Sequence, residues 1–132
     1  MPRTPMRASA DAMEMAETIF GDGVEVVDAT YTGDRWATGL FQLADTRIPL
    51  ASPSDTGLVF STGDVRSFSN SNGRNLFSNT STDNDGVDGD ADFDALAGGS
   101  TYDAAFLEVD FIPDANVMTM QFVFASEEFP EY

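Results

Sequence analysis

The chain has 132 residues, the size of one domain, and its 23 acidic and 6 basic residues give a formal net charge of −17. A charge of this sign repels phosphate backbones and anionic lipids, so we expect no nucleic-acid partner. Cys and His are both absent. Their absence removes disulfides, thiolate nucleophiles, the commonest transition-metal ligand and the commonest general base, and with them most enzyme templates.

The amino-terminal segment, residues 1–8, contains two prolines and shows no periodicity, which predicts a flexible tail. Its arginines are not followed by a continuous apolar core, so the segment is not a Sec signal peptide. No apolar run approaches the roughly 20 residues that a membrane-spanning helix needs, and we expect no membrane insertion. Residues 9–132 are expected to form a single domain.

A short helix is predicted over about residues 9–20, because apolar residues such as Met13, Ala16 and Ile19 recur there at helical spacing. Ser9 is the expected N-terminal cap, and Asp11 lies in the first turn. The sequence Gly-Asp-Gly at 21–23 ends the helix. Its apolar stripe is expected to pack against the core, with Glu14 and Glu17 facing solvent.

The remaining pattern predicts strands. Residues 24–31 and 58–61 are expected strands, and residues 36–43 form a less clear one. Residues 106–112 and 117–125 alternate apolar and polar side chains around a proline-containing turn, which predicts an antiparallel hairpin. The chain is therefore expected to be mostly β.

Residues 67–100 form the longest stretch without a clear hydrophobic pattern, and such a loop in a compact domain is usually functional or disordered. Within it, residues 83–94 read DNDGVDGDADFD, with Asp at six of the twelve positions. These carboxylates repel one another unless water, salt or a bound cation offsets their charge. Calcium prefers oxygen ligands, which closely spaced Asp side chains can supply from one flexible loop.

An EF-hand does not fit this run. Starting at Asp88, the aspartates at 90 and 92 match, but Phe93 stands where glycine is required and Gly99 where glutamate is required. An irregular calcium site and a solvated acidic loop both stay open. The ligands predicted for the calcium site are Asp88, Asp90, Asp92 and Asp94, with Glu127 and Glu128 as distant contributors.

Two further constellations give alternative functions. Glu127, Glu128 and Glu131 follow the last predicted strand, and a carboxylate pair can act as acid and base in a hydrolase. Nothing nearby in the sequence supplies a nucleophile or an oxyanion hole, so an enzyme is not expected. Trp36, together with the tyrosines, can offer stacking platforms to a sugar ring, although a lone Trp in a small β domain is more often a core residue.

Residues 98–113 (GGSTYDAAFLEVDFIP) and 120–132 (MQFVFASEEFPEY) resemble the choice-of-anchor L domain of bacterial surface and secreted proteins. The helix with GDGV at 21–24, YTG at 31–33 and GLVFSTG at 57–63 fit the same family. The resemblance covers about residues 9–132, and the paired glutamates before Pro-Glu-Tyr are its most specific part. Members of the family continue past the point that corresponds to Tyr132, so this chain resembles the amino-terminal part of a longer domain.

With this resemblance, we expect an antiparallel β-sandwich or jelly-roll-like fold with one short amino-terminal helix, incomplete at its carboxyl end. An unpaired edge strand would then favour self-association. The resemblance implies an extracellular or cell-surface module, without catalysis, that serves adhesion or matrix structure and is stabilised by calcium. Its expected partner is a protein or glycan surface.

Overall fold

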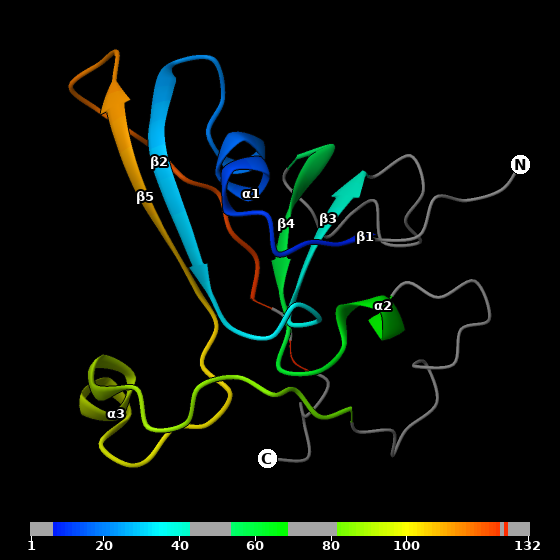
Figure 1. Cartoon of the computed structure of the whole chain (residues 1–132). Helices are drawn as coiled ribbons and strands as arrows, with labels where there is room; N and C mark the ends of the chain where they lie inside the picture. Colours follow the sequence, from blue (N-terminus) through cyan, green and yellow to red (C-terminus); the bar gives the residue numbers. More distant parts are fainter. Residues whose placement is uncertain (1–6, 43–53, 69–81, 125, 127–132) are drawn as a thin grey trace, which may run out of the picture.

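The structure is a computed structural model that describes residues 7–42, 54–68, 82–124 and 126 of the chain. Its strands form two antiparallel sheets (Figure 1). One sheet pairs β2 (Val24–Thr32) with β5 (Phe106–Pro113), and the other has the order β1 (Arg7–Ala8), β3 (Thr38–Gln42), β4 (Thr56–Phe60). The prediction of a mostly β chain is confirmed, whereas the sandwich or jelly-roll arrangement stays a prediction.

Helix α1 (Ala12–Ile19) lies between the two sheets and contacts β2, β4 and β5 (Figure 1). Its buried residues are Met15 and Ala16. Ala16 belongs to the predicted apolar stripe, whereas Met15 lies outside it, and Met13 and Ile19 of the stripe are only half-buried. The expected cap, Ser9, is not the capping residue of the helix. Asp11 caps the helix by accepting a hydrogen bond from the Glu14 N–H at 3.1 Å, because its carboxylate reaches the third residue onward from an extended backbone.

The β2–β5 sheet has the alternation expected of a half-buried pair. Leu107, Val109 and Phe111 are half-buried, whereas Glu108 and Asp110 between them are exposed. The Phe111 ring packs 4.9 Å from the ring of Phe20 at the end of α1, which joins the helix to this sheet. The register shifts between Val26 and Asp28, so the two exposed residues 27 and 28 follow one another along β2.

The β1–β3–β4 sheet adds the second part of the core. Thr38 of β3 is fully buried, and its hydroxyl donates a hydrogen bond to the backbone carbonyl of Ser9. Ala37 and Val65 are buried beside it. Residues 7 and 8, predicted as part of a flexible tail, instead form β1 because their backbone pairs with β3. Residues 1–6 lie outside the described part of the chain.

Helical turns occupy parts of the region predicted to be one long loop. Helix α2 (Val65–Phe68) follows β4, and helix α3 (Ala91–Ala97) begins inside the aspartate-rich run and extends beyond it. The prediction missed α3 because the apolar spacing of ADFDALA is weak and the helix has no buried residue. Its start and end are set instead by capping residues, which a hydrophobic pattern does not register.

The predicted second strand of the hairpin is absent from the described residues. Residues 117–124 are not part of a strand, and β5 pairs with β2 in a sheet of two strands. The Asp114 N–H donates to the Gly23 carbonyl at 3.1 Å, which extends that pairing beyond the end of β5. Alternation showed that residues 117–124 suit a strand but could not show which partner the strand needs.

Candidate functional site

The aspartate-rich run begins α3 with a capping carboxylate. The Asp90 side chain accepts hydrogen bonds from the N–H groups of Asp92 and Phe93, at 3.1 and 3.2 Å. The helix ends at Gly98, whose φ of 70° places it in the left-handed conformation typical of a glycine helix end. One of the predicted metal ligands, Asp90, thus has a structural role.

Asp94 fixes the chain that leaves α3. Its Oδ1 accepts hydrogen bonds from the Thr101 N–H at 2.5 Å and from the Thr101 hydroxyl at 2.7 Å. The Phe93 ring contacts the Phe106 ring edge to face, with 5.8 Å between the ring centres. Together these contacts join α3 to the beginning of β5, so the helix is held in place by one charged and one aromatic contact.

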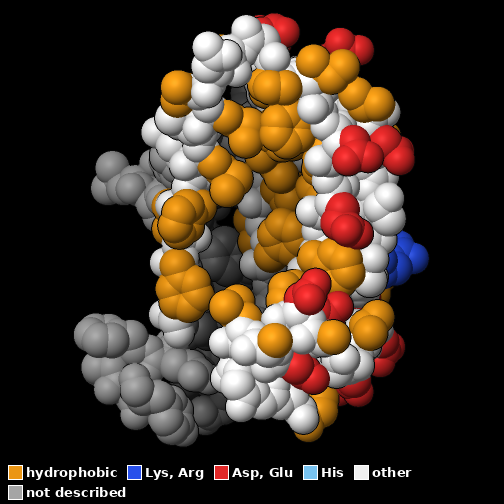
Figure 2. Space-filling model, turned by 90° about the vertical axis from the view of Figure 1, so that its left-hand side faces the viewer, with side chains coloured by type: hydrophobic (Ala, Val, Ile, Leu, Met, Phe, Trp, Pro, Cys, Tyr) orange, Lys and Arg blue, Asp and Glu red, His pale blue; other side chains and the backbone are white. Residues whose placement is uncertain are grey.

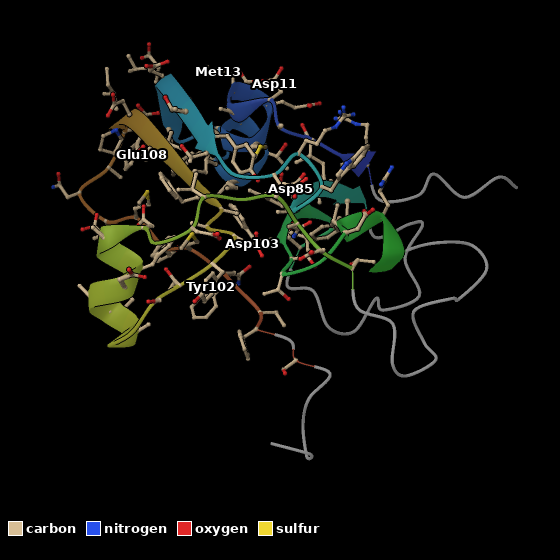
Figure 3. The ribbon with its side chains drawn as sticks, turned by 60° about the horizontal axis from the view of Figure 1, so that its bottom comes forward. Asp11, Met13, Asp85, Tyr102, Asp103 and Glu108 are labelled. Atoms are coloured by element: carbon tan, nitrogen blue, oxygen red, sulfur yellow. The ribbon has the colours of Figure 1, made fainter. Side chains whose placement is uncertain are left out.

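Two crossing segments meet around Gly86 and Asp103. The Gly86 N–H donates to Asp103 Oδ1 at 3.2 Å, and the Asp103 N–H donates to Asp88 Oδ1 at 3.3 Å. A bridge between Val87 and Ala104 completes the contact, and Ala104 is buried. Figure 3 shows Asp85 and Asp103 on these neighbouring segments, near the centre of the molecule. A second predicted metal ligand, Asp88, therefore also has a structural bond.

The predicted metal ligands do not form a metal-binding cluster within the part of the chain that the structure describes. No group of three or more acidic side chains there is arranged to hold a metal ion. Asp92 is exposed in the first turn of α3, where the positive end of the helix dipole stabilises its negative charge. Glu127 and Glu128 lie outside the described residues, so the complete predicted ligand set of Asp88, Asp90, Asp92, Asp94, Glu127 and Glu128 is untested.

Asn84 is a feature of the run that sequence reasoning did not single out. The residue is 5 % exposed, and its side-chain N–H donates to the Ser61 carbonyl at 3.4 Å. Its Oδ1 is buried and accepts no hydrogen bond from a described residue. Leaving a buried acceptor unpaired costs free energy, and an amide oxygen is one of the ligands that calcium accepts.

Asp34 connects the aspartate-rich run to the loop between β2 and β3. Its two carboxylate oxygens accept hydrogen bonds from the Asp85 N–H at 2.7 Å and from the Trp36 N–H at 2.8 Å. These backbone donors, Asp85 first, lower the pKa of Asp34 below its ordinary value because they stabilise the charged form. Sequence reasoning missed Asp34, whose partner is 51 residues away in the chain.

Trp36 lies beneath two arginine side chains. The guanidinium carbon of Arg66 is 3.3 Å from the centre of the Trp36 ring, and that of Arg35 is 4.1 Å away. Asp64 holds Arg66 there by accepting hydrogen bonds from the Arg66 Nε–H and Nη2–H groups, and these bonds lower the pKa of Asp64. A sugar ring that stacks on the indole face covered by Arg66 would have to displace its guanidinium group.

The tyrosines offer no shared platform with Trp36 among the described residues. The Tyr31 hydroxyl donates to the Asp34 carbonyl at 2.6 Å, and burial raises the pKa of Tyr31. Tyr102 is 71 % exposed on the segment after α3, and Tyr132 lies outside the described residues. The carbohydrate hypothesis stays a prediction without a supporting contact, and the hydrolase hypothesis rests on Glu127, Glu128 and Glu131, which are also not described.

The most exposed apolar part of the described chain is residues 117–124, which we name the apolar segment. Figure 2 views the molecule from the side of β5 and shows hydrophobic side chains gathered in an elongated hollow, with acidic side chains along one border. The apolar segment follows β5 and contains no charged residue. Its large apolar residues and their exposed fractions are Val117 78 %, Met118 53 %, Met120 70 %, Phe122 81 %, Val123 55 % and Phe124 86 %.

Comparison with known proteins identifies the family. No curated protein and no solved structure matches the chain. None of the helices in the described residues has the length and apolar character needed to cross a bilayer. The family model described as "Choice-of-anchor L domain" matches residues 4–132, which is essentially the whole chain. The chain therefore belongs to the choice-of-anchor L domain family, and this membership indicates a bacterial surface-associated module.

Proposed function

We propose that the chain is an extracellular or cell-surface module that serves adhesion or matrix structure by binding another polypeptide, without catalysis. The observation that carries this proposal is the exposure of the apolar segment. Contiguous apolar surface of this kind costs free energy in water and marks interaction sites in soluble proteins. A surface-associated module with such a segment is suited to holding a partner.

The carboxylates support a role without catalysis. Asp34 and Asp64 have lowered pKa values, so both stay ionised at neutral pH, whereas a catalytic acid needs a raised value. Asp88, Asp90 and Asp94 use their oxygens to hold backbone N–H groups. These acidic groups therefore position the chain rather than a substrate.

A cell-attachment assay tests the adhesion proposal. The chain is displayed on a non-adherent bacterial host, and retention of the cells on a protein-coated surface and their clumping are measured. We expect display to raise attachment and the double variant Phe122→Ser/Phe124→Ser to abolish the increase. Leu96→Ser is the matched control, because Leu96 is 88 % exposed but lies on α3. Attachment no higher than that of the bare host, or equal attachment by the double variant, overturns the proposal.

Calcium stabilisation stays part of the proposal. The unpaired Oδ1 of Asn84 and the exposed carboxylate of Asp92 are oxygen donors within the predicted run. A ligand that binds only the folded state raises its stability by mass action.

A further inference from the structure

The methionine side chains of the described residues differ sharply in their access to solvent. On α1, Met13 is half-buried and Met15 is 0 % exposed. In the apolar segment, Met118 is 53 % exposed and Met120 is 70 % exposed. A small reagent dissolved in water therefore reaches Met118 and Met120 directly, whereas it reaches Met15 only after the helix moves away from the core.

Methionine supplies all the sulfur of this chain. Because Cys is absent, no thiol competes for an oxidant, and none can form a disulfide with an oxidised neighbour. A methionine thioether is oxidised to the sulfoxide, which is polar where the thioether is apolar. Met118 and Met120 are thus the most accessible sites for this chemistry in the part of the chain that the structure describes.

Oxidation at these two positions would change the character of the apolar segment. Its sequence, VMTMQFVF, contains two polar side chains, Thr119 and Gln121, among eight. Two sulfoxides would raise the number of polar side chains from two to four. A polar group that becomes buried against an apolar partner without a hydrogen bond costs free energy, so the oxidised segment is a poorer binding surface.

We propose that Met118 and Met120 form an oxidation site at which a peroxide switches off the binding surface of the apolar segment. This inference rests on the proposed adhesive function and names a regulation of it. The partner binds the thioether form, and the sulfoxide form releases it. The switch is reversible, because methionine sulfoxide is a substrate for reduction, unlike the higher oxidation states of cysteine.

The chemistry of the switch is a transfer of one oxygen atom. A lone pair of the methionine sulfur attacks one oxygen of hydrogen peroxide, and the O–O bond breaks. The departing oxygen takes up the proton of the transferred oxygen and leaves as water, so the sulfur loses two electrons and the peroxide gains them. In the reverse step, two thiols of a reductase give one disulfide, the thioether and water.

Mass spectrometry of the full chain, treated with dilute hydrogen peroxide, tests the site. We expect Met118 and Met120 to gain oxygen at least roughly tenfold faster than Met15, because susceptibility follows exposure. The same treatment in concentrated urea is the control, and there the three rates should become equal. Equal rates in the folded chain overturn the proposal, because the fold would then not select these sulfurs.

The attachment assay tests the effect of oxidation on binding. Displayed cells are treated with peroxide and washed, and their attachment is compared with that of untreated cells of the same variant. Attachment by the unaltered chain should fall at least roughly tenfold, and a methionine sulfoxide reductase should restore it. In Met118→Leu/Met120→Leu the ratio of treated to untreated attachment should stay near one, because leucine has a similar volume and no sulfur.

The outcomes separate this switch from the adhesive function. Oxidation of both methionines without a loss of attachment overturns the switch and leaves the adhesive function standing. An equal loss in the double leucine variant also overturns the switch, because the damage would then lie at another residue. If untreated cells do not attach, the adhesive function fails and the regulation fails with it, while the oxidation rates still decide whether Met118 and Met120 are the reactive site.

Discussion

Residues 83–103 and residues 117–124 are opposites in chemistry and in how they are held. The first region is crowded with carboxylates, and nearly every turn of it is fixed by a side chain that accepts a backbone N–H. The second is apolar and uncharged, yet no described residue pairs with it. A polar side chain can find its partner within a few residues, whereas an apolar strand depends on a distant edge or on another molecule.

A substitution at Gly86, where the chain crosses close to Asp103, should give the largest loss of stability. A Cβ at Gly86 would lie 2.5 Å from the Asp103 carbonyl carbon and 2.6 Å from its Cα. Because backbone atoms cannot rotate away, Gly86→Ala should destabilise the fold by about 3 kcal/mol. Gly99→Ala is the control, since a Cβ there meets nothing within 4 Å. Urea unfolding measures both, and equal midpoints would show that the crossing is loose in solution.

Replacement of Asp94 should give the next largest loss of unfolding free energy. Asp94→Ala removes both hydrogen bonds to Thr101 and should lower the unfolding free energy by about 2 kcal/mol, as expected for bonds to a charged acceptor. Asp92→Asn is its control, because the exposed Asp92 side chain makes no hydrogen bond to a described residue. If both variants unfold at the same urea concentration in the presence of chelator, the loop is not held by Asp94.

Calcium distinguishes a structural carboxylate from one that binds metal. If calcium binds, a concentration ten times its Kd should stabilise the fold by about 1.4 kcal/mol. We expect millimolar calcium to raise the melting temperature relative to chelator at fixed ionic strength. Asp92→Asn should reduce that increase while leaving the melt in chelator unchanged. Identical melts of the unaltered chain in calcium and in chelator would reject the calcium site.

Much of the fold could be predicted from the sequence. The strand at β5 follows from its alternation of apolar and polar residues, and β2 follows from its strand-favouring residues although both of its faces are mixed. Helix α1 follows from the helical spacing of its apolar residues. Helix α3 was missed because caps at Asp90 and Gly98 define it, without a buried face. The strand predicted beyond residue 116 was wrong because alternation carries no information about the partner.

The candidate site was harder to predict for a related reason. The many Asp residues marked residues 83–94 as unusual and suggested that they bind one calcium ion together. In the structure, Asp88, Asp90 and Asp94 instead accept hydrogen bonds from separate backbone N–H groups. Asp34 and Asn84 have partners 51 and 23 residues away, in the run and in the segment after β4. Such pairings appear only after the chain has folded, because nothing in their local sequence distinguishes them.

Acid should weaken the carboxylate-rich side of the molecule. The pKa values of Asp34 and Asp64 are lowered from 3.8 in the folded chain, so the unfolded chain binds their protons more tightly. Their contribution to stability is present above pH 3.8 and is lost as the pH falls through the lower folded values. Both groups are half-buried and still reached by water, which screens their interactions, so the loss is small.

Urea midpoints measured from about pH 6 down to about pH 2 test this dependence. Asp34→Asn should make the decline below pH 3.8 shallower, because one of the two shifted groups no longer titrates. Asp92→Asn serves as the control at an exposed carboxylate that bonds no backbone group in the described residues. An equally steep decline in Asp34→Asn would show that its two backbone bonds do not persist in solution.

The apolar segment should give the smallest change in stability. Phe122 and Phe124 are 81 % and 86 % exposed, so Phe122→Ser/Phe124→Ser should alter the unfolding free energy by no more than about 0.5 kcal/mol. Phe111→Ser, which removes the ring that packs on Phe20, should cost about 1 kcal/mol or more. A cost in the double variant as large as that of Phe111→Ser would mean that the segment already packs against its own domain. Both regions would then be held by internal contacts, and the surface offered to a partner would have to lie elsewhere.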